Sequence, residues 1–355
     1  MSSVFQKSIV INNHYLYTRN FYRCLYHQKR SITSIREIQT RLKSIQNTKK
    51  ITDSMKLIAT NKLENAEKSL NIARQIGNSF NTYFKNIKAT DKISDRNIII
   101  AVGSDKGLCG GVNTSVSRAL KFFVEDDNET NNIKNSKTKS LKKQKSNDDH
   151  DNDNDNDNEY LEQPNHRVFI IGDKIKSQVA KNIPNHIEMI YSGIGGKKQS
   201  SPTFYEVCLI CDDINYVMQE KLLNSEVLED DSYDEIFDSG FILFNRYINS
   251  VSYEITTLPV YTRETIINSP NLFTYKYDED IFDELQEFAF AINLYWALSE
   301  GYMTELSSRK YAMENSSRNA KEIINNLIKS INHSRQTHIT NELIDISTGA
   351  NNYKK

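Results

Sequence analysis

Residues 281–331 read IFDELQEFAFAINLYWALSEGYMTELSSRKYAMENSSRNAKEIINNLIKSI. Apolar or small residues recur in this stretch at steps of three and four. The series is Phe282, Leu285, Ala289, Ile292, Trp296, Ser299, Met303, Leu306, Met313, Ala320, Ile324, Leu327 and Ile331, with Lys310 and Ser317 as polar interruptions. A heptad pattern kept in phase for about seven repeats predicts a long helix that pairs with another helix in a coiled coil.

A second long helix is predicted near the start of the chain, where residues 32–76 contain neither glycine nor proline. Its apolar or small stripe consists of Ile35, Ile38, Leu42, Ile45, Thr48, Ile51, Met55, Ala59, Leu63, Ala66 and Leu70. The spacing changes from steps of three before Ile51 to steps of four after it. Such slips predict local overwinding and then unwinding of a coiled coil.

These two helices should pair with each other. They would be roughly 70–85 Å and roughly 100 Å long at the α-helical rise per residue. Each buried stripe side chain contributes about 1.5–3 kcal/mol, whereas an isolated helix is marginal in water. Because the helices bracket the chain, an antiparallel pair is the simplest arrangement. The alternative is that each helix pairs with a separate partner.

The middle of the chain has a different composition, since it holds all five prolines and most of the glycines. Apolar and β-branched runs predict strands, and amphipathic segments between them predict helices. The expected strands are 97–103, 166–172, 187–191, 241–247 and 251–257, and the expected helices follow residue 113, span 174–183 and run from Pro202 to about 223. Strands separated by helices favour a mostly parallel, Rossmann-like α/β domain.

The predicted organisation is a helix over 31–90, the α/β domain over 95–260 and a second helix over 271–355. Residues 1–36 contain no Asp or Glu, and their basic, Ser-bearing composition predicts a mitochondrial transit peptide over 1–30; a disordered basic tail is the alternative. Residues 125–163, which include an Asp-Asn alternation at 151–158, have too few apolar side chains to offset the entropy of ordering and are predicted to be a disordered insert.

Several function classes find little support. The turn GSDKGLCGG at 103–111 matches neither nucleotide-binding glycine pattern, so it more simply packs a helix against a strand. Cys208 and Cys211 lie within an apolar run and are interpreted as two buried thiols. A net charge of -1 gives no electrostatic case for nucleic acid. The longest apolar run, near Ile98–Val102, is too short for direct bilayer insertion. No catalytic residue, cofactor or metal is expected.

Three motifs, in this order, resemble the gamma subunits of F-type ATP synthases. They are SIQNTKKITDSMKLIA at 44–59, SDKGLCGGVN at 104–113, and the pair ELSSRKYAMENSSRNA at 305–320 and RQTHITNELIDISTGA at 335–350. The resemblance covers nearly all of the chain outside the leader and the insert. The insert and the Lys- and Asn-bearing tail after Ala350 depart from the family pattern.

The resemblance implies a non-catalytic central shaft that couples proton flow to ATP synthesis and hydrolysis. Its implied partners are the alpha and beta subunits of the catalytic head, the small central-stalk subunits (delta/epsilon) and the membrane c-ring, on the matrix side of the mitochondrial inner membrane. The implied contacts with the catalytic subunits are Lys49, Lys50, Met55, Lys56, Arg335, Gln336, Thr340 and Glu342. Met55 is equally compatible with a stripe position alone, and Gln336 and Thr340 with solvated helix positions.

Two rival functions remain at this level. One is a coiled-coil scaffold or tether with an α/β binding head. The other is a nucleotide-dependent enzyme. Stoichiometric co-purification with an ATPase ring separates the shaft from the scaffold, and nucleotide titration of the isolated chain tests the enzyme.

Overall fold

The computed structural model describes residues 35–89, 97–124, 166–181, 183–196, 200–226, 239–277 and 281–352. The chain divides into two compact units, one spanning 54–314 and the other combining 1–53 with 315–355. The predicted leader, 1–30, and the predicted insert, 125–163, lie outside the described residues. No helix among the described residues is both long and apolar enough to cross a membrane.

A five-stranded sheet organises the unit over 54–314. Its strands are β1 (Asn97–Val102), β2 (His166–Ile171), β3 (Ile187–Tyr191), β4 (Ser239–Tyr247) and β5 (Tyr253–Val260), in the order β3-β2-β1-β4-β5. β1 pairs in parallel with both β2 and β4, and β2 pairs in parallel with β3. Only β5 is antiparallel to its neighbour within this sheet. The predicted mostly parallel α/β fold is therefore confirmed.

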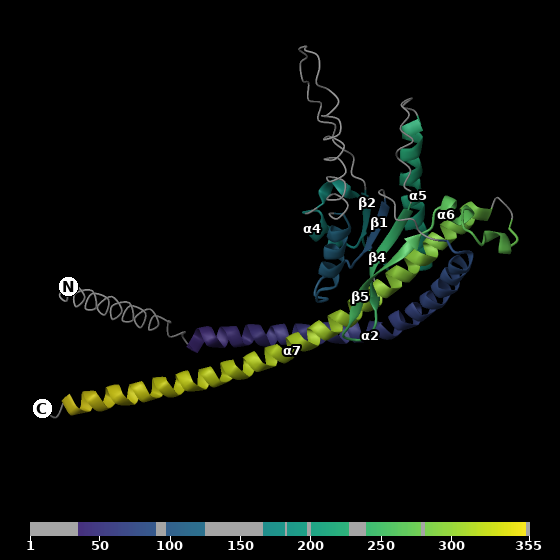
Figure 1. Cartoon of the computed structure of the whole chain (residues 1–355). Coiled ribbons are helices and arrows are strands. Elements are labelled where there is room, and N and C mark those ends of the chain that lie inside the picture. The colour runs from purple at the N-terminus through teal and green to yellow at the C-terminus, as the bar shows by residue number, and fades with distance from the viewer. Residues whose placement is uncertain are drawn as a thin grey trace, which may run out of the picture. The chain divides into compact units, whose positions relative to one another are not determined.

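Helices cover both faces of the sheet, as expected for strands joined by crossovers (Figure 1). On one face, Val207 of α5 (Phe204–Glu226) and Leu294 of α7 (Ile281–Asn352) belong to the same apolar cluster as Ile100. On the other face, a helix over 112–124 and α4 (Asp173–Val179) pack on Ile99 and its neighbours. The core of this unit thus has two layers, one on each face.

The start of α5 differs from the prediction by two residues. The hydroxyl of Thr203 accepts a hydrogen bond from the Glu206 amide at 3.3 Å, and the Glu206 carboxylate accepts one from the Thr203 amide at 3.0 Å. This reciprocal pair is a capping box, so Thr203 begins the helix and Pro202 stands just outside it. Proline at 202 marks the turn before the helix rather than its first residue.

Two long helices flank the sheet domain in the sequence: α2 (Ile35–Ile87, 53 residues) and α7 (72 residues). The second begins later than the predicted residue 271. The described part of 271–280 contains the short helix η3 (Leu272–Thr274), which follows α6 (Arg263–Ile267). Leu272 packs with Phe84 of α2 and Phe282 of α7, so this segment covers the end of the helix pair instead of extending α7.

α2 and α7 run antiparallel and side by side within the unit over 54–314 (Figure 1). Leu70 packs with Met303, and Phe84, further along α2, packs with Phe282, nearer the start of α7. Between these layers the Trp296 ring lies against Gly77. In the other unit, Ser317 donates a hydrogen bond to Asp53 at 2.5 Å. Pairing of the two helices with each other is confirmed.

The predicted stripe of α7 is confirmed by burial. Every residue of the series from Phe282 to Ile331 is buried or half-buried, and so are the polar interruptions Lys310 and Ser317. Beyond Ile331 the helix continues, but its side chains are almost all exposed. The heptad pattern therefore locates both the packed part of α7 and the point where that packing ends.

The predicted stripe of α2 is wrong in its middle. Thr48 is exposed, and Ile51 is 59% exposed. Met55 of the predicted stripe is half-buried, and so are Lys62, Ser69 and Arg74. The buried and half-buried positions that keep a strict alternation of three and four are Leu42, Ile45, Lys49, Thr52, Lys56, Ala59, Leu63, Ala66, Leu70 and Ala73.

The prediction is wrong here because polar side chains occupy some of the buried positions of the α2 stripe. Thr52 bonds its hydroxyl to the Lys49 carbonyl at 2.8 Å. Lys49 pairs with Asp53 at 2.8 Å within its own helix, and Lys56 reaches Glu314 at 3.5 Å. Lysine stems cover apolar surface while their ammonium groups find partners at the edge. A stripe defined by apolar residues alone therefore places Thr48 and Ile51 one residue before the observed positions Lys49 and Thr52.

The two cysteines of α5 only partly match their predicted burial. Cys211 is buried and Cys208 is half-buried, and both are free thiols. Burial raises the pKa of each thiol, and of Cys211 most strongly. A raised pKa disfavours the thiolate, which is the reactive form of cysteine.

Candidate functional site

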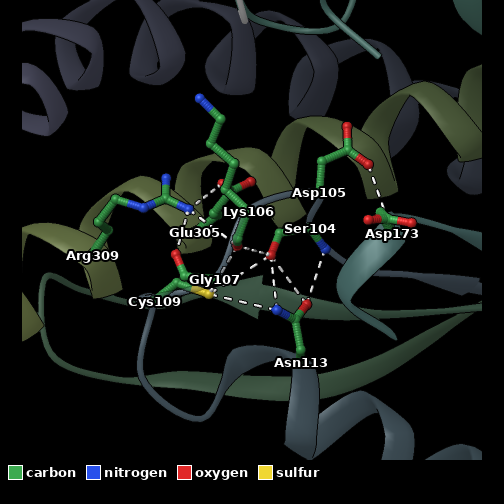
Figure 2. A network of polar contacts seen from close by, with 9 residues as sticks. All are labelled: Ser104, Asp105, Lys106, Gly107, Cys109, Asn113, Asp173, Glu305 and Arg309. Carbon is green, nitrogen blue, oxygen red and sulfur yellow. Dashed lines mark hydrogen bonds and ion pairs between the residues drawn. The ribbon is translucent and has the colours of Figure 1, made fainter. Parts of the chain in front are cut away.

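The loop that follows β1 is held by a compact network of hydrogen bonds, shown in Figure 2. The Asn113 side chain accepts from the Ser104 amide at 3.0 Å and donates to the Ser104 hydroxyl at 2.9 Å. That hydroxyl donates to the Lys106 carbonyl at 2.8 Å. The loop is therefore folded on itself by its own side chains, and burial raises the pKa of the enclosed Cys109 thiol.

Asp105 ties this loop to two neighbouring segments. Its carboxylate accepts hydrogen bonds from the amide of Asp173, at the start of α4, and from the amide of Gly193, after β3. Gly172, which directly follows β2, comes close to the backbone of Gly103, which directly follows β1. A Cβ at position 172 would lie 2.8 Å from the Gly103 carbonyl carbon, and the φ of Gly172 is +115°, so glycine is required there. The loops at the carboxyl ends of three parallel strands are thus bound together.

Arg309 connects the same loop to α7. Its guanidinium donates to the Lys106 and Gly107 carbonyls, each at 3.2 Å, and to the Glu305 carboxylate at 2.5 Å. Burial raises the pKa of Glu305, while Arg309 acts in the opposite direction. The glycine-rich turn is predicted to pack a helix against a strand, and the structure adds a contact with α7 through the guanidinium of Arg309.

A cavity of about 500 Å³ opens beside this loop, at the carboxyl ends of β1 and β2. Its walls come from α2, the 103–108 loop, the start of α4 and α7. The charged residues that line it are Lys62, Asp105, Lys106, Lys174, Glu305 and Arg309. Among the described residues, no group of three or more histidine, cysteine or carboxylate side chains could hold a metal ion.

Lys62 of α2 experiences the charge of this cavity directly. Its pKa is lowered, first by burial and then by the positive charges of Lys106 and Arg309, with Glu305 opposing them. Helix α2, the loop and helix α7 therefore bring cations together across the cavity. Sequence reasoning missed this group, because its members lie on separate elements and only the fold places them together.

The four proposed contact residues on α2 have different environments. Lys50 is exposed, whereas Lys49, Met55 and Lys56 are half-buried. Lys49 and Lys56 are already in ion pairs with Asp53 and Glu314. Met55 lines the cavity. These residues do not form one continuous basic stripe on the helix surface.

The four proposed contact residues on α7 are Arg335, Gln336, Thr340 and Glu342, and all are exposed. The Thr340 hydroxyl bonds back to the Gln336 carbonyl at 2.9 Å. The Glu342 carboxylate lies 3.2 Å from a ring nitrogen of His338, one turn earlier. Contacts within single turns of α7 thus order part of this surface.

Sequence reasoning also missed an ion pair that joins both long helices to the sheet. Arg74 of α2 donates to both carboxylate oxygens of Glu300 on α7, at 2.6 and 2.8 Å. Glu300 also accepts from the Tyr247 amide of β4 at 2.9 Å and from the Trp296 indole at 3.0 Å. The available signal was Glu300, a charged residue next to the predicted stripe position Ser299.

Comparison with known proteins agrees with this architecture. The ATP synthase family model matches residues 34–352. The mitochondrial ATP synthase gamma subunit of Saccharomyces cerevisiae is 32% identical over 330 residues, covering 90% of this chain and 89% of that protein. The Drosophila melanogaster mitochondrial gamma subunit is 31% identical, covering 91% and 92% respectively.

Solved structures show the same fold at lower sequence identity. A rotor chain of the Euglena gracilis mitochondrial ATP synthase aligns with a TM-score of 0.59 at 14% identity, covering 86% of this chain and 99% of that one. A central-stalk chain of the Tetrahymena thermophila enzyme aligns with a TM-score of 0.50 at 18% identity, covering 75% and 99%. Together with the family match, these relatives establish that the chain belongs to the ATP synthase gamma subunit family.

Proposed function

We propose that this chain is the central rotating shaft of a mitochondrial ATP synthase, which couples proton flow through the membrane rotor to ATP synthesis and hydrolysis. The observation that carries the proposal is the antiparallel pair of α2 and α7, joined to the sheet by Arg74 and Glu300. A paired helix resists twisting better than a loop. Membership of the gamma subunit family supports the same assignment.

The proposed partners are the alpha and beta subunits of the catalytic head, the small central-stalk subunits (delta/epsilon) and the membrane c-ring. The similar solved structures are of a central stalk with a c-ring and of a rotor. The relatives are named mitochondrial, which supports a position on the matrix side of the inner membrane. The chain itself is proposed to be non-catalytic and to hold no cofactor for the reaction.

A shaft changes the state of a catalytic subunit only if its contact free energy differs between the states of that subunit. We therefore assign the exposed Arg335, Gln336, Thr340 and Glu342 to this contact. Their exposure in the isolated chain supports the assignment, because polar side chains free of packing are available to a partner. Lys49, Lys50, Met55 and Lys56 form the proposed α2 side of the contact.

Truncation after Ile331 tests the shaft assignment. It leaves the unit over 54–314 complete, so that unit should fold and assemble with the other central-stalk subunits. Coupled ATP synthesis should fall, because the contact residues of α7 are removed. Proton-driven ATP synthesis in inverted membrane vesicles measures the effect, with circular dichroism of the variant as the folding control. ATP synthesis equal to that of the full chain would contradict a shaft function.

The rival function is a coiled-coil scaffold or tether. Pull-down of the tagged chain from an organelle extract separates the two, because a shaft is recovered with an ATPase ring in fixed stoichiometry. Recovery without alpha and beta subunits would favour the scaffold. We also propose that residues 1–30 act as a mitochondrial targeting segment, which import of a fusion carrying these residues tests.

A further inference from the structure

The cavity beside the 103–108 loop is placed and sized like a ligand site. It lies beyond the carboxyl ends of β1 and β2, the edge at which open α/β sheets hold their ligands. Its volume of about 500 Å³ falls within the range of small-molecule sites.

The cavity carries a surplus of positive charge. Four cations line it, Lys62, Lys106, Lys174 and Arg309, against the two carboxylates Asp105 and Glu305, and four minus two leaves a charge of +2. Both carboxylates are already engaged. Glu305 accepts from Arg309, and Asp105 accepts from two backbone amides. The lining as a whole is therefore net positive, which favours an anion.

The lysines are positioned to meet that anion. The ammonium group of Lys106 makes no hydrogen bond or ion pair with the described residues, and Figure 2 shows its side chain extending away from the hydrogen-bonded loop. The positive charges of Lys106 and Arg309 help to lower the pKa of Lys62. A bound anion would offset the repulsion among these cations, as a phosphate group does where it is bound by several basic side chains.

The rest of the wall is apolar. Ile58, Leu298 and Tyr302 line the cavity, together with Leu108, whose side chain is 62% exposed. Leu108 also has a positive φ of 63°, an uncommon conformation for a residue other than glycine. An inorganic ion alone would leave this apolar surface uncovered. The lining therefore fits a ligand that has both a phosphate group and a flat or apolar portion.

We propose that this cavity binds a phosphate-bearing small molecule of about nucleotide size, with its phosphates against Lys62, Lys106 and Lys174 and its ring against Ile58 and Tyr302. Recognition is by side chains, since the loop lacks the glycine pattern of a backbone phosphate cradle. Because α2, α7 and the sheet loops all form its walls, an occupied cavity would tie the helix pair more firmly to the sheet.

Calorimetric titration of the isolated full chain tests the proposal, because the catalytic subunits, which would bind nucleotide themselves, are absent. The probes are ADP, inorganic pyrophosphate and adenosine. We expect saturable binding of ADP without its turnover, which separates a bound ligand from a nucleotide-dependent enzyme. Binding of pyrophosphate should be weaker, and binding of adenosine weaker still. Absence of ADP and pyrophosphate binding would overturn the proposal. Pyrophosphate binding as tight as that of ADP would overturn the nucleotide-sized ligand.

Two lysines of α4 provide a matched pair of variants. Lys174 lines the cavity, whereas Lys176, which is also exposed and on the same helix, is not among the cavity's lining residues. Lys174→Gln and Lys106→Gln should each weaken ADP binding by about 10-fold to 100-fold, the loss expected for one charge-assisted hydrogen bond. Lys176→Gln should leave it unchanged. Equal losses for Lys174→Gln and Lys176→Gln would show non-specific charge attraction and overturn the site.

A protein partner could compete for the same charge. An acidic decapeptide rich in Asp and Glu, added during the ADP titration, measures this competition. Weak competition by the peptide supports the small-molecule site. Displacement of ADP by the peptide at lower concentration than by pyrophosphate would assign the cavity to an acidic partner segment and overturn the proposal. Neither outcome affects the pull-down that tests the shaft function.

Discussion

Arg74 and Glu300, separated by 226 residues in the sequence, form a two-bond ion pair between α2 and α7. Glu300 has no exposed surface, and Arg74 keeps about a third of its side chain exposed, at 32%. The same pair reaches β4, because Arg74 donates to the Tyr247 carbonyl and Glu300 accepts from the Tyr247 amide. Three elements that must turn together are thus connected at one point.

Replacing Arg74 by methionine should destabilise the unit over 54–314. The substitution keeps a long apolar stem but leaves the Glu300 carboxylate buried without its counter-charge. The loss expected from removing one partner of a buried pair is about 3 kcal/mol in the free energy of unfolding. Urea denaturation followed by circular dichroism measures it.

An exposed ion pair on the same helix serves as the control. Lys68 and Glu64 lie 2.8 Å apart, with side chains that are 67% and 77% exposed. Lys68→Met should produce no measurable change, because solvent already screens this pair. A similar effect of the two methionine substitutions would contradict the special role of the buried pair.

Two of the three glycines within the long helices, Gly77 and Gly349, should respond to alanine in opposite directions. A Cβ on Gly77 would stand 2.5 Å from the Trp296 ring, so Gly77→Ala should force α2 and α7 apart and lower stability. Gly349 has open space around it, and Gly349→Ala should stabilise its turn of α7 by about 1 kcal/mol. Thermal melting measures the first effect, and amide exchange near residue 349 measures the second. Stabilisation by Gly77→Ala would contradict the close helix contact.

Tyr191 predicts a dependence of stability on alkaline pH. Its hydroxyl is buried without a hydrogen-bond partner among the described residues, and burial beside Asp213 raises its pKa to about 12. Between pH 10 and 12 the unfolded chain loses this proton while the folded chain retains it. Stability therefore falls as pH rises through this window.

Tyr191→Phe should remove this contribution. At pH 7 the variant should be as stable as the original chain or slightly more stable, because an unsatisfied hydroxyl is deleted. Between pH 10 and 12 it should lose less stability than the original. Urea midpoints at pH 7, 10 and 11.5 provide the comparison, and parallel losses in both proteins would rule out the predicted titration.

Position 51 distinguishes the two possible stripes of α2. Ile51 is 59% exposed, so Ile51→Ser should leave the stability of the isolated chain nearly unchanged. Leu70 is only 2% exposed and packs with Met303, so Leu70→Ser should lower stability by about 2–5 kcal/mol, as for truncation of a buried leucine. Urea denaturation tests both variants. A large loss for Ile51→Ser would restore the stripe expected from apolar residues alone.

Much of the architecture could be predicted from local sequence. The strand over Ile187–Tyr191 has the predicted ends, and the other strands are displaced by at most a few residues. These predictions succeed because β-branched runs favour strands, and glycine and proline end them, through effects on the backbone of only a few neighbouring residues. The edge strand β5 was displaced most, since its ends depend on pairing with β4.

The candidate site could be predicted only in part. The 104–113 motif identified the loop, but not the contact that Arg309 makes with its carbonyls from 202 residues away. Lys62, Lys106 and Lys174 come from three elements, and no local pattern relates them. Their convergence depends on the close approach of Gly172 to Gly103 and on the packing of α2 beside α7.

By itself the sequence determined that the chain has two long helices and a mostly parallel sheet between them, because helix periodicity and strand composition are short-range properties. It also determined the stripe of α7, whose apolar residues allow one register. Tertiary structure alone decided the register of α2, where Lys49, Thr52 and Lys56 occupy the seam in place of Thr48 and Ile51. The physical reason is that burial of a polar side chain depends on partners such as Asp53 and Glu314, and those partners are known only once the chain has folded.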